Sequence, residues 1–139
     1  MTVITKELSF WTKGDTDIVD ITTGVQGELD GIKCKNGIVT IFIPGSTGGL
    51  TTIEHEPGLE SDFKKMIERL VPKNIEYAHD MRWHDGNGHS HIRSSIISPS
   101  LTVPFKDRQL LLGSWQQIIL VDFDNRPRSR KVLLQIMGE

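Results

Sequence analysis

The 139-residue sequence predicts an α+β fold, with a mainly antiparallel, β-sandwich-like body that carries two helices. Most of the chain consists of short segments that are rich in β-branched residues or alternate between apolar and polar residues, separated by Gly, Pro and Asn turns. Two other segments repeat their apolar residues every three or four positions, as amphipathic helices do. Because this length supports one core and no linker interrupts it, we treat residues 1–139 as a single domain.

Six segments predict strands. The first alternates loosely and predicts a half-buried strand, whereas the second is apolar throughout and predicts a central strand covered on both faces. The remaining four make the second half of the chain mostly antiparallel sheet, and Trp115 in the fifth segment is predicted to be a core residue. The predicted strands are residues 2–11, 38–43, 92–97, 101–105, 110–122 and 131–137.

The two predicted helices lie in the first half of the chain. Residues 21–32 repeat apolar side chains at helical spacing, and Thr23 and Gln26 have the spacing of a capping box. The second helix contains the apolar face of residues 63–70 and ends before Pro72. We therefore expect two helices packed on a sheet-rich body.

Composition and charge exclude several classes of protein. The chain is 37% hydrophobic and 24% charged, and its formal charge of −2 argues against both a disordered chain and a polycationic partner of nucleic acid. The single Cys34 can form neither an internal disulfide nor a thiolate metal cluster, which favours an intracellular, cytoplasmic protein. No apolar run approaches the roughly 20 residues that cross a bilayer, so we expect no membrane partner.

Four of the five histidines fall between residues 79 and 91. If the residues from His89 onward form a strand, His89 and His91 project from one face and can chelate one ion. His79 or His84, returning over the Gly-Asn-Gly turn, would complete a three-nitrogen site with an open position. The carboxylates that could orient these ligands or bind the metal directly are Asp80, Asp85 and Glu54.

The predicted cofactor is a divalent metal held by His79, His89 and His91. Zinc is the first candidate, and manganese, iron and nickel accept the same ligands. The alternative is a polar loop whose histidines face water. His55 stands apart from the group and is assigned no role.

A glycine-rich segment supplies candidate substrate-binding residues. Its exposed amides and hydroxyls can hold an anion, although a plain turn explains the same composition. Arg93 would share a strand face with His89 and His91, so we prefer it as the phosphate ligand to the basic residues 126–131, which we assign to a solvated hairpin end. The substrate-binding candidates are Gly45, Ser46, Thr47, Gly48, Arg93 and Gln116, and the catalytic candidates are Glu54 and His84.

Four motifs in the sequence resemble those of one known family, and the resemblance covers nearly the whole chain. They are Pro44-Gly-Ser-Thr-Gly-Gly-Leu-Thr-Thr-Ile-Glu54, Asp85-Gly-Asn-Gly-His-Ser-His-Ile-Arg93, Ser100-Leu-Thr-Val-Pro104 and Leu112-Gly-Ser-Trp-Gln-Gln117. Together they resemble the YjbQ-like family, often labelled secondary thiamine-phosphate synthase. The resemblance implies a small α+β fold, assembly as a homotrimer, a histidine cluster that holds a metal or substrate, and a weak coupling of a hydroxymethylpyrimidine diphosphate with a thiazole phosphate.

The chain departs from the family pattern in the glycine-rich segment. The family pattern resembles P-H-T-T-A-G-x-T-I-N-E, whereas this chain has Gly45 at the histidine position and Ile53 at the asparagine position. Either His84 or His89 replaces the missing ligand, or the metal site is altered. The residues that match the family are His79, His91 and Glu54, together with His89, which belongs to a D-G-N-G-H-x-H variant.

Two functions from different classes follow. The first is a metal-dependent enzyme that acts on a phosphorylated small molecule, with Ser46, Thr47 and Arg93 contacting phosphate and a histidine-bound ion stabilising the leaving diphosphate. The second is a non-catalytic, metal-stabilised trimer that binds a small metabolite or a partner.

Overall fold

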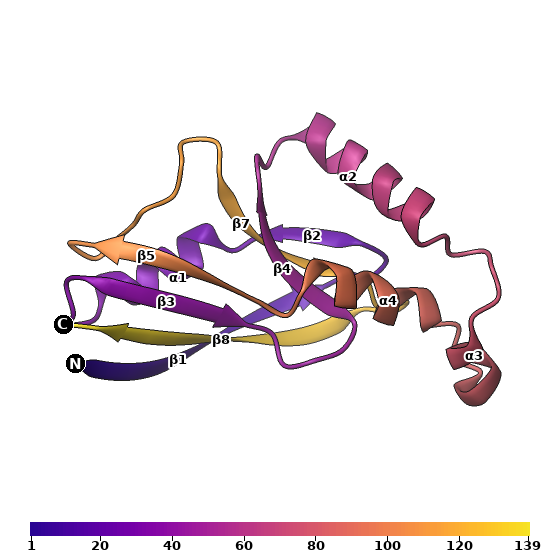
Figure 1. Cartoon of the computed structure of the whole chain (residues 1–139), viewed down its shortest axis with the longest axis horizontal. Helices are drawn as coiled ribbons and strands as arrows, with labels where there is room; N and C mark the ends of the chain where they lie inside the picture. Colours follow the sequence, from indigo (N-terminus) through magenta and orange to yellow (C-terminus); the bar gives the residue numbers. More distant parts are fainter.

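Two antiparallel sheets form the body of the molecule, which we describe from a computed structural model of residues 1–139 (Figure 1). The larger sheet has five strands in the order β1-β8-β3-β5-β6, and the smaller has three in the order β2-β7-β4. The elements in chain order are β1 (Thr2–Thr12), β2 (Asp17–Asp20), α1 (Thr22–Asp30), β3 (Gly37–Phe42), β4 (Gly48–Ile53), α2 (Pro57–Leu70), α3 (Ala78–Trp83), α4 (Gly88–Ile97), β5 (Ser100–Lys106), β6 (Gln109–Leu110), β7 (Gln117–Asp122) and β8 (Arg128–Gly138). The predicted α+β class is confirmed, with four helices in place of the predicted two.

β7 is the strand that other elements cover on both faces. The sequence instead predicted that residues 38–43, which form most of β3, would be covered on both faces. Every residue of β7 from Ile118 to Asp122 is buried, because one face joins the main core and the other packs against α2 and α4. β3 lies in the middle of the larger sheet, but its side chains alternate. Val39 and Ile41 are fully buried, whereas Ile38 and Phe42 each expose 40% of their surface. The prediction of a doubly covered β3 is wrong for the single chain.

The helix α1 confirms the first predicted helix but not its predicted cap. Val25 and Leu29 are fully buried in the main core. The carboxylate of Asp20 accepts hydrogen bonds from the backbone N–H and the hydroxyl of Thr22, at 2.9 and 2.7 Å. Asp20, which precedes the helix, therefore accepts the hydrogen bond of the first backbone N–H of α1. The predicted capping box of Thr23 and Gln26 does not form.

The main departure from the predicted secondary structure is α4, where residues 92–97 were predicted as a strand. His89, Arg93 and Ile97 recur every four residues and face the protein interior, which is a helical pattern. Because an α-helix turns by about 100° per residue, His91 points about 200° away from His89. The prediction that His89, His91 and Arg93 share one strand face is therefore wrong.

The predicted strand 110–122 is also interrupted. β6 ends at Leu110, and a turn follows in which the Gln116 side chain accepts a hydrogen bond from the N–H of Gly113 at 3.0 Å. Trp115 lies in this turn with 76% of its surface exposed, so its assignment to the core is wrong.

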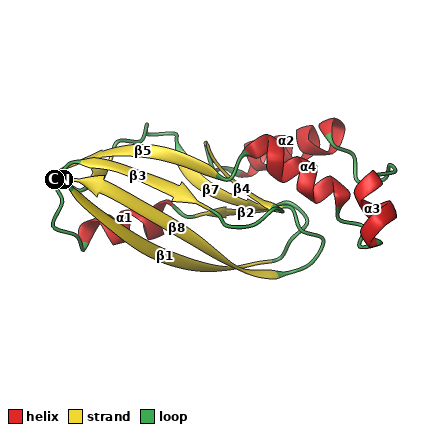
Figure 2. Ribbon diagram, turned by 60° about the horizontal axis from the view of Figure 1, so that its bottom comes forward, coloured by secondary structure: helices red, strands yellow, loops and turns green.

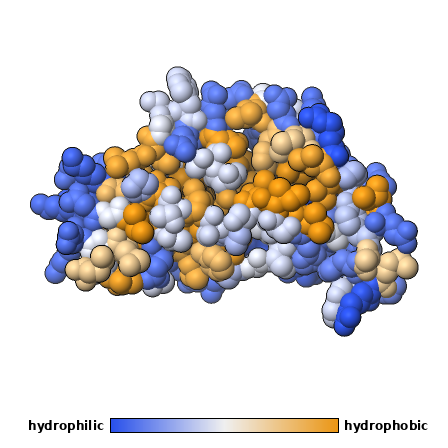
Figure 3. Space-filling model, in the orientation of Figure 1, coloured by the Kyte–Doolittle hydropathy of each residue, from blue (hydrophilic) through white to orange (hydrophobic).

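The helices divide between the two ends of the molecule. Figure 2 shows α2, α3 and α4 together at one end, while α1 lies beneath the larger sheet near the chain termini. Figure 3 shows apolar residues gathered over α4 on the visible face. None of the helices is both long and apolar enough to cross a membrane.

Candidate functional site

A polar pocket of about 290 Å³ lies between the β3–β4 loop and α4. Apart from Pro99, its lining residues are glycine, serine and histidine, which offer hydroxyl, imidazole and backbone groups that can bind a polar ligand. The lining residues are Gly45, Ser46, His91, Ser94, Ser95 and Pro99.

A histidine and carboxylate group adjoins this pocket. The rings of His79 and His91 lie with their centroids 4.3 Å apart, so His91 connects the pocket to the group. The Nδ1 atom of His79 is buried and makes no hydrogen bond, although carboxylate oxygens of Asp80 and Asp85 lie 3.5 and 3.4 Å away. One ligand atom from each of His79, Asp80 and Asp85 falls within 4.8 Å of the others. This donor set fits a divalent cation, since imidazole nitrogen and carboxylate oxygen are ligands of zinc and manganese.

The backbone around α4 positions both carboxylates. Asp80 accepts a hydrogen bond from the N–H of Gly88 at 2.8 Å, and Asp85 accepts one from the N–H of Asn87 at 3.1 Å. Burial raises the pKa of Asp80, but the hydrogen bond from the Gly88 N–H and the nearby His79 ring outweigh it, so the net pKa is lowered. The start of α4 therefore holds two carboxylates against His79, and Asp80 is charged at neutral pH.

Neither His89 nor His84 belongs to this group. His89 is buried, with its ring centroid 6.4 Å from that of Tyr77, and burial and then Arg93 lower its pKa. His84 is exposed and ends α3 in a left-handed conformation, with φ of 54°. The expected convergence of His79, His89 and His91 is therefore wrong, because only His79 and His91 meet.

Arg93 is bound by protein groups on three sides. Its Nε and Nη2 donate to the carbonyl of Val71 at 3.0 and 2.8 Å, and Nη2 also donates to Glu68 at 2.6 Å. Its Nη1 donates to the hydroxyl of Thr16 at 3.1 Å. The guanidinium therefore ties α4 to the end of α2 and does not line the polar pocket.

The glycine-rich segment divides between the pocket and the core. Gly45 and Ser46, two of the predicted substrate-binding residues, line the pocket. The buried Thr47 hydroxyl instead donates to Asp124 at 2.9 Å. A side chain at Gly48 would meet Ile43, with the added Cβ 2.7 Å from Cδ1, so this glycine allows close packing. One part of the predicted anion-binding loop thus lines the pocket, and the other part supports the fold.

Glu54 and Gln116 lie at the opposite end of β4 from the pocket. Glu54 is exposed just beyond Ile53, and Gln116 donates to the hydroxyl of Thr52 at 3.2 Å. Since a strand rises about 3.4 Å per residue, Gly48 and Ile53 are on the order of 17 Å apart. Glu54 and Gln116, predicted as a catalytic and a substrate-binding residue, therefore do not line the pocket.

A buried charge network supports the loop, and sequence reasoning missed it. Arg130 donates from Nε and Nη2 to the two oxygens of Asp122 at 2.7 and 2.8 Å, and from Nη2 to Thr47 at 2.6 Å. The hydrogen bond to Asp122 raises the pKa of Arg130. Asp122 is fully buried and only 11% of the Arg130 side chain is exposed, so the assignment of Arg130 to a solvated hairpin end is wrong. Its alternation with Val132 along β8 was the available signal.

Backbone strain also occurs at the pocket edge. Ser98 adopts φ of 87° and ψ of 149°, a conformation that L side chains rarely adopt, directly before the lining residue Pro99. Its N–H donates to the carbonyl of Ser94, and its carbonyl accepts from the N–H of Leu50, both at 3.0 Å. Strain of this kind persists where surrounding contacts enforce it, and it clusters at functional sites.

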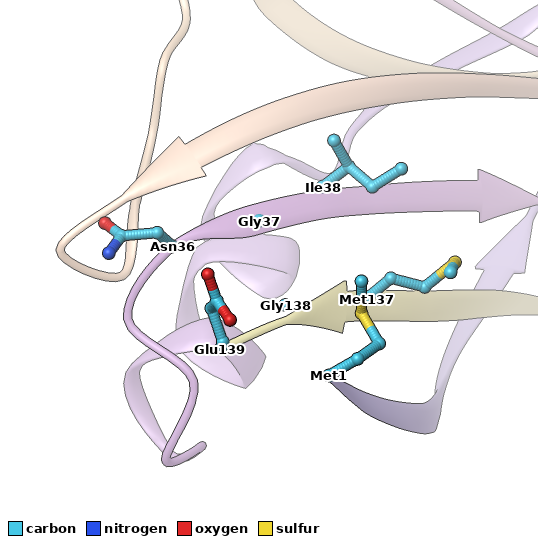
Figure 4. A pocket seen from close by; sticks show the side chains of 7 residues that line it. All are labelled: Met1, Asn36, Gly37, Ile38, Met137, Gly138 and Glu139. Atoms are coloured by element: carbon cyan, nitrogen blue, oxygen red, sulfur yellow. The ribbon is translucent and has the colours of Figure 1, made fainter.

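A second hollow, of about 430 Å³, lies at the other end of the molecule (Figure 4). Three of its seven lining residues are apolar and two are glycines. Glu139 is the one lining residue with a carboxylate side chain. We take the polar pocket as the candidate functional site because it adjoins the histidine and carboxylate group. The residues around the second hollow are Met1, Asn36, Gly37, Ile38, Met137, Gly138 and Glu139.

The fold and site define an α+β protein with a polar pocket beside a candidate metal-binding group. Residues 6–139 match the family described as UPF0047 protein YjbQ-like, and the chain belongs to this family. A UPF0047 protein of Methanothermobacter thermautotrophicus is 34% identical over 139 residues, which cover 100% of this chain and 95% of that protein. A UPF0047 protein of Methanocaldococcus jannaschii is 36% identical over 124 residues, covering 88% of this chain and 86% of that one.

Solved structures show the same fold. The crystal structure of a YbjQ-like protein of unknown function from Sulfolobus solfataricus has a TM-score of 0.93 and 29% identity, with 99% of each chain covered. A hypothetical protein from Aeropyrum pernix has a TM-score of 0.90 and 29% identity, with 98% of this chain and 99% of that chain covered. The resemblance inferred from the four sequence motifs is thereby confirmed.

Proposed function

We propose that this protein is a metal-dependent enzyme that acts on a phosphorylated small molecule and works as a homotrimer. The observation that carries the proposal is the buried, unpaired Nδ1 of His79 beside the carboxylates of Asp80 and Asp85. A buried polar atom without a partner is costly, and a cation between these three groups would satisfy it. Zinc is the first candidate for the ion, with manganese as its main competitor at a site that contains two carboxylates.

The polar pocket would hold the substrate next to this ion. When bound, a divalent ion would stabilise negative charge that develops on a leaving phosphate or diphosphate. His91 connects the metal group to the pocket and is in reach of both, so it is the candidate for orienting a ligand or moving a proton. The amide and hydroxyl of Ser46 would bind phosphate oxygens at the other wall. The reaction to test first is the coupling of a hydroxymethylpyrimidine diphosphate with a thiazole phosphate.

The alternative is a non-catalytic protein that binds metal and a small metabolite. The positions of Glu54 and His84 favour it, since neither predicted catalytic residue lines the pocket. Binding of both metal and phosphorylated ligand without turnover would support this alternative.

The metal site is tested by measuring bound zinc and manganese in the purified protein by mass spectrometry after dialysis. We expect the parent chain to retain about one ion per chain, and His79→Gln and Asp85→Asn to weaken binding by about tenfold or more because each removes a ligand. His55→Gln is the matched control, since His55 lies between Asp20 and Glu60 away from the site. Full metal retention by His79→Gln, or none by the parent, would contradict the proposal.

A further inference from the structure

The guanidinium of Arg130 has one nitrogen without a protein partner. Nε and Nη2 are bound by Asp122 and Thr47, whereas Nη1 makes no hydrogen bond. The buried polar atoms that lack a partner are His79 Nδ1 and Asp124 Oδ1, so the unpaired Nη1 of Arg130 must reach solvent. A charged group with two free N–H bonds is thus held rigidly at an accessible position.

Gly45 leaves the space in front of this nitrogen open. A Cβ atom added at Gly45 would lie 3.2 Å from Nη1, closer than ordinary van der Waals contact. The backbone of Gly45 is not in the left-handed region, so conformational freedom does not explain the glycine. Gly45 also lines the polar pocket, so the missing side chain leaves Nη1 exposed beside the Gly45 edge of the pocket, although Arg130 is not itself a lining residue.

The charges around Arg130 determine what it can bind. Asp122 and Asp124 are fully buried and balance Arg130 and Arg128, so the network has little net charge. Attraction for an anion therefore depends on the direction of the free Nη1 donors and on nearby donors of the pocket. His91 and the hydroxyl of Ser46 line the same pocket and supply further donors.

We propose that Arg130, kept accessible by Gly45, binds the phosphate end of a ligand that extends from the polar pocket past Gly45. This inference rests on the proposed function. It assigns to Arg130 and Gly45 the recognition of the phosphate group of the substrate. The metal group beside His91 and the guanidinium beside Gly45 would then contact the ligand from two sides. Arg93, which the sequence favoured for this role, already donates every guanidinium nitrogen to protein atoms.

The test is calorimetric titration of the chelator-treated full chain with inorganic pyrophosphate. We expect the parent to bind, and Gly45→Val to weaken binding by about tenfold or more, because the new side chain covers Nη1. Arg130→Lys, which keeps the charge but loses Nη1, should weaken binding similarly. Gly27→Val is the matched control, since a Cβ at Gly27 meets nothing within 4 Å, and it should bind as the parent does.

The outcomes separate this inference from the proposed function. Equal binding by Gly45→Val and the parent would overturn the inference, and this result remains decisive if Arg130→Lys does not fold. If the parent binds pyrophosphate only after zinc is added and Gly45→Val does the same, the metal alone recognises the anion and Arg130 has no role. If the parent binds pyrophosphate neither with nor without zinc, both the inference and the proposed function fail.

Discussion

At the scale of single residues, the role of a buried charged side chain depends on its hydrogen-bond partners, and Arg93 is an example. The side chain is 4% exposed and bridges Val71, Glu68 and Thr16. The N–H of Lys73 and then Arg93 lower the pKa of Glu68, which keeps this carboxylate charged for the bridge. Arg93 thus joins three segments of the helical end of the molecule.

We expect Arg93→Ala to lower the free energy of unfolding by about 2 kcal/mol, because it leaves the Val71 carbonyl buried without a donor. Urea unfolding measures this loss, and the exposed Arg126→Ala is the control. The folded variant should bind pyrophosphate as the parent does. An equally stable Arg93→Ala that no longer binds pyrophosphate would restore Arg93 as the phosphate ligand.

Asp124 makes stability depend on acid pH. Burial raises its pKa, but the hydrogen bond from Thr47 and the charge of Arg128 outweigh burial and lower the net value. The unfolded chain, with an ordinary Asp pKa of about 3.9, therefore takes up the proton at higher pH than the folded chain. The contribution of Asp124 to stability is complete above about pH 4 and is lost as pH falls toward its folded pKa.

We expect Asp124→Asn to be less stable than the parent at pH 7 and to approach it below about pH 4. Urea midpoints measured across this range test the expectation, with the exposed Asp62→Asn as the control. A difference between parent and variant that stays constant from pH 7 to pH 3 would show that the Asp124 carboxylate does not cause the dependence.

At the scale of elements, the site depends on how closely α3 approaches the start of α4. Gly88 is the contact point, because a Cβ there would lie 2.5 Å from the Cβ of Tyr77 and 3.2 Å from the carboxylate of Asp80. The absence of a side chain lets the Gly88 N–H reach Asp80, which in turn lies beside His79. The packing of these two helices therefore sets the geometry of the candidate metal group.

Gly88→Ala should lower the free energy of unfolding by about 2 kcal/mol through overpacking and should also reduce metal retention, because α3 must move away. Thermal unfolding and metal analysis of the same sample give both results. Gly27→Ala in α1 should instead raise stability by up to about 1 kcal/mol, since its site is open. Unchanged stability and metal content in Gly88→Ala would show that this contact is not tight.

At the scale of the whole molecule, the outward face of the larger sheet has no cover. One row across its strands is apolar, and a row of Thr and Gln side chains, with Thr5 to Gln135 at 2.8 Å and Thr40 to Thr102 at 2.9 Å, separates it from a second row in which Leu133 and Phe42 lie between Glu7 and Ser100. Exposed apolar surface of this extent is typical of association sites. The apolar residues of these rows are Val3, Met137, Ile38, Pro104, Leu133 and Phe42.

We expect this sheet face to be covered by further copies of the chain, and the number three comes from the family resemblance stated above. Sedimentation should show a trimer for the parent and smaller species for Phe42→Asp, which places a charge in the contact. Leu70→Asp, on the exposed end of α2, is the control and should remain a trimer. A monomeric parent at micromolar concentration would contradict the homotrimer.

Local patterns in the sequence determined the fold class, the family, most strands, α1 and α2, and the region that contains the site. Alternation and helical spacing report which face of an element is buried, and these patterns are visible without coordinates. The pairing of Gly45 and Ser46 with a pocket, and of His79 with His91, followed from their motifs.

Only the tertiary structure decided which side chains meet. Three isoleucines favoured a strand at residues 92–97, but the packing of His89, Arg93 and Ile97 against the interior stabilises a helix and separates His89 from His91. Arg93 and Arg130 are chemically alike in the sequence, and the difference lies in their distant partners, Glu68 and Val71 for one and Asp122 and Thr47 for the other. Contacts between residues far apart in the chain depend on how the elements pack, and a local pattern contains no record of that packing.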